Sequence, residues 1–153
     1  MGTKRVGLAR TQALIQNLKR ELQLNGTSLL GIKKKTQDVT TSVSATADDS
    51  GKVYFVNAGT TVLTLPTSAA AGAGWHCKII LTDEPATSFA VTANGTELMG
   101  LITCDDGSLQ SDANTTFTIN TSGNIGDWLE ITCDGTSMYI RGNLDAVAAG
   151  AWT

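Results

Sequence analysis

The sequence predicts a mainly β fold: an antiparallel β-sandwich or jelly-roll-like body preceded by a short N-terminal helical arm. After position 35, apolar residues alternate with polar ones, and turn-forming pairs such as Asn94-Gly95 recur at a spacing of roughly 8–12 residues. Thr is the most frequent residue, with 23 among 153. Its β-branched side chain suits a pleated, half-exposed surface. A chain of this length forms one domain with a substantial core.

The first predicted element is a helix over residues 8–24, within a basic anchoring arm of residues 1–35. Its apolar side chains fall near one stripe, formed by Leu8, Ile15, Leu18 and Leu22. Asn25 and Gly26 supply a stop signal. The stripe covers only about two heptads, which is too short for a stable isolated helix in water. We therefore expect the helix to pack on its own body, on sister chains or on a partner.

The body, residues 36–153, is expected to hold the strands. Phe117 and Ile119 alternate with polar residues, which predicts a half-exposed strand. Residues 53–56 are apolar in both phases and predict a strand covered on both faces. Residues 68–74 read as an Ala/Gly loop. The apolar C-terminal tail ends near Trp152, and we expect it to pack on a neighbouring copy or to fray. The predicted strands are 39–45, 52–57, 61–65, 75–82, 88–93, 97–104, 115–120, 127–133 and 137–141.

Charge is segregated between arm and body. The arm carries eight basic residues against one acid, a net charge of +7, and the body carries three basic residues against 13 acids, a net charge of −10. Such an arm can bind acidic patches of a protein partner, with the apolar stripe as the hydrophobic core of the contact. Nucleic acid is the weaker alternative, because the arm has no aromatic residue for stacking and the acidic body repels phosphates. The candidate partner-binding residues are Lys4, Arg5, Leu8, Arg10, Ile15, Leu18, Lys19, Arg20, Leu22, Lys33, Lys34 and Lys35, and Trp152 is a candidate for an oligomer interface.

Residues suited to catalysis are sparse. His76 is the only histidine, and three cysteines lie far apart inside apolar runs, as expected for buried strand thiols. His76 and Cys77 are adjacent, so a strand turns them to opposite faces and they cannot share a metal. No nucleophile elbow or phosphate-binding loop occurs. We expect no enzyme activity, no cofactor and no metal, although Asp-rich turns at 48–50 and 105–112 leave a calcium site open.

Membrane partners are also not expected, because no window approaches the roughly 18–20 apolar residues of a spanning helix. The N-terminus has basic residues without a continuous apolar stretch, so we expect no secretory signal.

Several motifs carry a resemblance to a known family. Residues 51–83 contain a strand ending in Leu65-Pro66 followed by the Ala/Gly loop, and a late hairpin runs from Gly126-Asp127-Trp128 through Asp134-Gly135 to Tyr139 and Gly142. This series resembles β-domains of tailed-bacteriophage virion proteins. Residues 3–15 resemble the N-terminal arms of capsid decoration (cement) proteins of marine podovirus-like phages.

The resemblance implies a structural virion protein, made in the host cytoplasm, that sits on the outer surface of the phage head. Its partners would be the major capsid protein and its own copies, as a homotrimer. The same β-domain motif also occurs in tail-fibre and tail-knob proteins, so a receptor-binding or carbohydrate-binding virion module is the alternative. That alternative needs exposed aromatic side chains over a groove, and the candidates are Trp75, Trp128, Tyr139 and Trp152.

Overall fold

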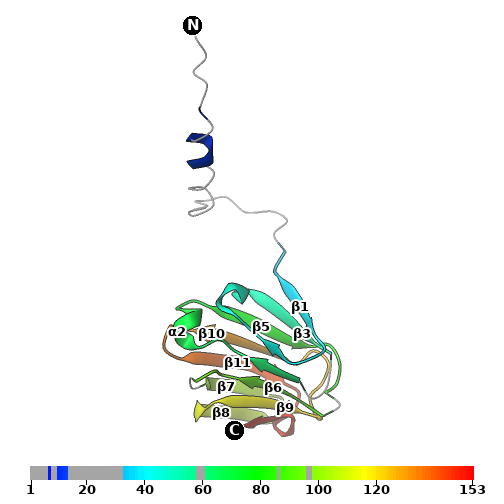
Figure 1. Cartoon of the computed structure of the whole chain (residues 1–153). Coiled ribbons are helices and arrows are strands. Elements are labelled where there is room, and N and C mark those ends of the chain that lie inside the picture. Colours follow the sequence, from blue (N-terminus) through cyan, green and yellow to red (C-terminus); the bar gives the residue numbers. More distant parts are fainter. Residues whose placement is uncertain (1–6, 8–9, 14–32, 58–60, 86, 96–97) are drawn as a thin grey trace. The chain divides into compact units, whose positions relative to one another are not determined.

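The computed structural model describes residues 7, 10–13, 33–57, 61–85, 87–95 and 98–153, and the chain divides into two units, residues 1–33 and 34–153 (Figure 1). In the first unit, residues 10–13 are helical, and the N–H groups of Arg10 and Thr11 donate to the Gly7 carbonyl at 2.9 and 3.2 Å. The rest of the helix predicted over 8–24 lies outside the described residues.

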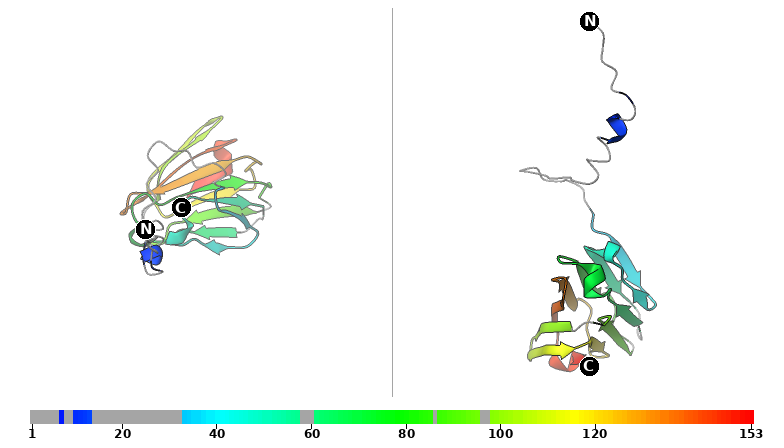
Figure 2. Two further views of the ribbon diagram at one scale, coloured as in Figure 1. Left: turned by 90° about the horizontal axis from the view of Figure 1, so that it is seen from above. Right: turned by 60° about the vertical axis from the view of Figure 1, so that its left-hand side comes forward.

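The second unit is a sandwich of two sheets, seen from two further directions in Figure 2. This confirms the predicted β-sandwich class. The larger sheet has the order β1 (Thr36–Val39), β3 (Lys52–Val56), β5 (His76–Leu81), β10 (Trp128–Cys133), β11 (Met138–Leu144), β7 (Leu98–Cys104) and β8 (Gly107–Asn114). The smaller sheet has the order β12 (Gly150–Trp152), β9 (Thr116–Asn120), β6 (Ser88–Thr92), β4 (Thr61–Thr64) and β2 (Val43–Ser44).

Both sheets are mixed, so the expected antiparallel, jelly-roll-like pairing is wrong for half of the strand pairs in the described part of the chain. β1, β3 and β5 run parallel to one another, as do β2, β4 and β6, and β7 runs parallel to β11. For the pairs among β1 to β6, the reason is that these six strands alternate between the sheets. Each sheet therefore receives every second strand, in the same direction each time, whereas a hairpin would reverse it.

Several element boundaries differ from the prediction. The strand expected over 39–45 is two strands, because the chain leaves the larger sheet after Val39 and enters the smaller one at Val43. β8 was not predicted, since its sequence is mostly polar, and β11 continues three residues beyond Arg141. The Ala/Gly loop contains a short helix, α2 (Ser68–Ala71), capped by the Thr67 hydroxyl, which accepts the Ala70 N–H at 3.2 Å. Single 3₁₀ turns lie at Ala47–Asp49 and Val147–Ala149.

The core lies between the two inner faces and follows the period-two pattern. In β9, Phe117 and Ile119 are fully buried while their neighbours are half-exposed, which confirms the predicted half-exposed strand. In β3, Val53 and Tyr54 are both buried although they face opposite sides, as expected for a strand covered on both faces. Cys77 and Cys133 are buried and Cys104 is half-buried, so two of the three thiols fill the core as predicted.

A candidate binding surface on the larger sheet

The outer face of the larger sheet carries a row of charged side chains. In the strand register, Lys78 of β5 is opposite Glu130 of β10, and Glu130 is opposite Arg141 of β11. Residues in register on neighbouring strands point to the same side of a sheet. Their inward neighbours Ile79, Leu129 and Ile131 are fully buried, so the charged row faces away from the core.

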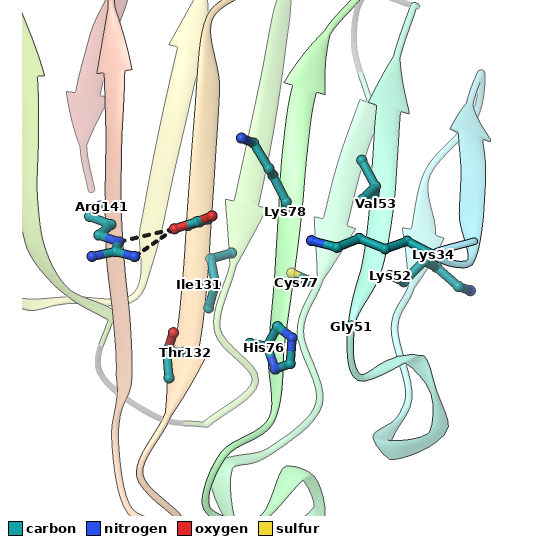
Figure 3. Close-up of a pocket in the computed structure, with 11 residues that line it drawn as sticks. Lys34, Gly51, Lys52, Val53, His76, Cys77, Lys78, Ile131, Thr132 and Arg141 are labelled. Carbon is teal, nitrogen blue, oxygen red and sulfur yellow. Dashed lines mark hydrogen bonds and ion pairs between the residues drawn. The ribbon is translucent and has the colours of Figure 1, made fainter. Parts of the chain in front are cut away.

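A hollow of about 240 Å³ lies over this row (Figure 3). Figure 3 shows Arg141 on one side of it, with Lys78, His76 and Lys34 around the other. We call it the basic hollow; its ionisable lining residues are Lys34, Lys52, His76, Lys78, Glu130 and Arg141. Lys52, Lys78 and Arg141 are all the basic residues of the body, residues 36–153. Lys78 and Arg141 extend from this sheet face, whereas Lys52 is in register with buried Cys77 and its ammonium turns to the opposite side of β3.

Two of these cations are engaged within the body. Lys52 forms an ion pair with Asp49 and donates to the Gln37 Oε1 at 3.0 Å. Burial alone would raise the pKa of Asp49, but its hydrogen bonds with Lys52 and Thr46 outweigh burial and lower that pKa. Arg141 donates from Nε and Nη2 to the Glu130 Oε2 at 3.0 and 2.8 Å. Because the Arg141 side chain is 76% exposed, this pair contributes at most about 1 kcal/mol to stability.

The other cations remain available to a partner. The Lys78 ammonium lies 4.7 Å from the centre of the Trp128 ring, a cation–π contact that leaves its charge unneutralised. Lys34 is exposed, and neither Lys34 nor Lys78 has a carboxylate partner in the part of the chain that the structure describes. The His76 Nδ1 lies 3.1 Å from the Gly74 carbonyl oxygen. The basic hollow therefore keeps a positive excess.

Apolar side chains border the basic hollow on the same sheet face. Phe55, Ile80 and Trp128 are in register across β3, β5 and β10, and all three are half-buried. Leu101 and Tyr139 are 45% and 44% exposed. Aromatic residues and arginine are enriched in the centres of protein–protein interfaces. The combination of apolar border and unneutralised cations is typical of a surface that binds an acidic macromolecule.

The described part of the predicted arm site comprises only Arg10, Lys33, Lys34 and Lys35. All four are exposed, and Lys35 Nζ donates to the Asp48 carbonyl at 3.3 Å. The structure places Lys34 in one hollow with basic residues of the body that the sequence prediction did not include. The rarity of basic residues in the body was the available signal, but the common face of Lys78 and Arg141 depends on strand register. The remaining predicted residues lie outside the described ranges: Lys4, Arg5, Leu8, Ile15, Leu18, Lys19, Arg20 and Leu22.

Two of the four candidate aromatic residues, Trp75 and Trp152, contact other residues of the body. Trp75 is 2% exposed, and its Nε1 donates to the Thr46 carbonyl at 3.1 Å. Trp152 packs on Phe117 with ring centres 4.8 Å apart. The C-terminal tail forms β12 and pairs with β9, so the alternative that it would fray is corrected: it completes its own sheet. A role for Trp152 in self-association stays a prediction.

The Asp-rich turns use carboxylates to hold the backbone. Asp49 Oδ2 accepts the Thr46 N–H at 2.8 Å, and Asp106 Oδ1 accepts the Val147 N–H at 2.6 Å. Among the residues with described positions, no group of three or more His, Cys, Asp or Glu side chains is arranged to hold a metal ion. Within the same residues, no helix has the length and apolar character needed to cross a membrane.

No protein-family model matches the chain, and no curated protein matches it either.

Proposed function

We propose that this chain is a non-enzymatic structural protein of a phage virion. In this proposal it is a capsid decoration protein that binds the outer surface of the head and stabilises contacts between major capsid subunits, with its own copies as further partners. The observation that carries the proposal is the gathering of cations beside an apolar border on one sheet face. Lys33, Lys34 and Lys35 lead directly into β1 of that sheet, and Lys34 lines the basic hollow.

A shell-binding protein needs a surface that holds its partner over a broad area. Charges on that surface select the partner, and apolar contacts exclude water. The exposed lysines before β1 supply the charges, and the resemblance of residues 3–15 to the arms of decoration proteins supports the same use of the arm. The proposal therefore assigns binding to both the arm and the outer sheet face.

The test is binding to expanded phage shells, measured by co-sedimentation. A variant without residues 1–24 is expected to keep the β-rich circular dichroism spectrum of the body and to lose shell binding. In the full-length chain, replacing Lys33, Lys34 and Lys35 by Gln is expected to weaken binding at low salt. The difference from the wild type should shrink as the salt concentration rises, because salt screens the charges that the variant lacks. If the truncated protein still decorates shells fully, the arm has no anchoring role and the proposal is wrong.

A second candidate function is a tail-fibre, tail-knob or carbohydrate-binding module of the virion. The observation in its favour is that Trp128 and Tyr139 lie on the same outer sheet face, where a sugar ring could stack. Stoichiometry in purified virions separates the two functions, because a shell protein follows the copy number of the major capsid protein and a tail protein does not. Loss of glycan binding on Trp128→Ala, with shell binding absent, would favour the second function.

A further inference from the structure

The body carries an acidic surface that complements the basic hollow. Asp105 and Asp106 follow the end of β7, and Asp145 follows the end of β11, the strand beside it. All three side chains are exposed, and we call them the acidic edge. Asp127 is 6% exposed. Burial is the main cause of its raised pKa, and the nearby carboxylates of Asp145 and Asp105 also raise it. The acidic edge is therefore a concentrated negative charge.

The backbone holds the acidic edge in place. The Asp105 N–H donates to the Asp145 carbonyl at 3.3 Å, and the Asp145 N–H donates to the Asp127 carboxylate at 3.1 Å. Within the described ranges, ion pairs join Lys52 to Asp49 and Arg141 to Glu130, and neither involves the acidic edge. The acidic edge thus keeps its negative charge, just as Lys34 and Lys78 keep their positive charge.

The two charged surfaces cannot neutralise each other within one molecule. Arg141 and Asp145 are four residues apart along an extended strand, which corresponds to about 13 Å. Lys78 is two strands away from β11, so its backbone is roughly 16 Å from that of Asp145 at the usual strand spacing. Both surfaces lie on one sheet, whose hydrogen-bonded strands keep this separation. Contact between the basic hollow and the acidic edge therefore requires two copies.

We propose that the acidic edge of one copy docks into the basic hollow of another. Lys34 and Lys78 would meet Asp105 and Asp145 of the second copy, and the exposed side chains of Leu101 and Tyr139 would supply apolar contact. Because the two surfaces differ, the contact is head-to-tail, and copies close into a ring or extend into a chain. This inference rests on the self-association in the proposed function and names its interface, but it does not require the shell.

The test uses two full-length variants with reversed charges. The first carries Lys34→Glu and Lys78→Glu, and the second carries Asp105→Lys and Asp145→Lys. A matched control for the second variant changes charge by the same amount elsewhere on the surface: Asp83→Lys with Glu84→Lys. Sedimentation velocity at low and high salt measures the mass of each protein, and circular dichroism checks that each is folded.

We expect the wild type and the Asp83→Lys, Glu84→Lys control to associate at low salt and to dissociate as salt rises. Each reversed variant alone should associate at least tenfold more weakly, because like charges then face each other. An equimolar mixture of the two variants should associate again, since each now offers the other complementary surfaces. Lys78→Gln, which only removes a charge next to Glu130, should weaken association roughly two- to fivefold.

Three results would overturn the inference: a wild type that stays monomeric at low salt, reversed variants that associate as the wild type does, or a mixture that does not recover. A monomeric wild type that decorates shells would refute this interface and leave the proposed function standing. A wild type that associates through this interface but does not bind shells would support this interface and refute the proposed function.

Discussion

Replacing Tyr54 by Phe is expected to stabilise the protein, although most substitutions of a core residue destabilise. Tyr54 is fully buried in β3, and its hydroxyl has no hydrogen-bond partner among the described residues. Burial raises the pKa of this hydroxyl, and the Asp49 carboxylate raises it further, so the group stays neutral. Removing the oxygen removes a buried polar atom without changing the shape of the ring.

The expected size follows from two opposing contributions. A buried hydroxyl without a partner costs about 1–3 kcal/mol. The Lys52 ammonium lies 5.4 Å from the centre of the Tyr54 ring, and weakening this contact returns roughly 0.5 kcal/mol. We therefore expect Tyr54→Phe to raise the free energy of unfolding by about 1 kcal/mol, which corresponds to about 3–5 °C in Tm for a domain of this size.

The assay is urea unfolding of the full-length chain at neutral pH, followed by tryptophan fluorescence with buried Trp75 as the main reporter. The midpoint should rise with an unchanged m value, because the surface exposed on unfolding is the same. Tyr139→Phe is the matched control. Its exposed hydroxyl donates to Asp134 Oδ2 at 3.1 Å, so its loss should change stability by less than about 0.5 kcal/mol. A Tyr54→Phe variant less stable than the wild type by 1 kcal/mol or more would show that the hydroxyl is satisfied and that the reasoning is wrong.

Three further predictions concern the sheet, the thiols and acid. Gly142→Ala places a Cβ 2.3 Å from the Trp128 carbonyl oxygen on the paired strand, so urea unfolding should show a loss of about 3 kcal/mol, whereas Gly7→Ala, with open space around it, should show none. Burial raises the pKa of the Cys77 thiol to about 12, so native-state labelling by iodoacetamide should reach half-buried Cys104 before Cys77; equal rates would contradict the structure. The N–H groups of Ser137 and Thr136 lower the pKa of Asp134 below 3.8, so its contribution to stability is present above that pH and disappears as the pH falls through the lowered pKa. Asp134→Asn should therefore lose less stability than the wild type on acidification from about pH 5 to about pH 2, as measured by thermal unfolding.

The basic hollow illustrates why the candidate site could be predicted only in part. The sequence alone shows that the body has three basic residues, Lys52, Lys78 and Arg141, which are widely spaced along the chain. It does not show that Lys78 and Arg141 share one sheet face, because this depends on β5 being paired with β10 and β10 with β11. Lys34 was predicted as part of the binding arm, and the structure adds it to the same hollow.

The sequence by itself determined which side chains form the core. In β9 and β10, every second residue is apolar and buried, because a strand turns successive side chains to opposite faces and only one face meets the other sheet. It also determined the turn at Asp134 and Gly135, where the Asp carboxylate accepts two backbone N–H groups and Gly adopts a φ of 96°.

Only the tertiary structure decided which strands are neighbours. Alternation specifies the face that each residue presents but carries no information on the adjacent strand, so parallel pairs between β1, β3 and β5 were missed. The polar sequence of β8 becomes a strand because the unpaired edge of β7 offers it hydrogen bonds. The segregation of charge was visible in the sequence, but the separation of the basic hollow from the acidic edge follows from strand pairing and register.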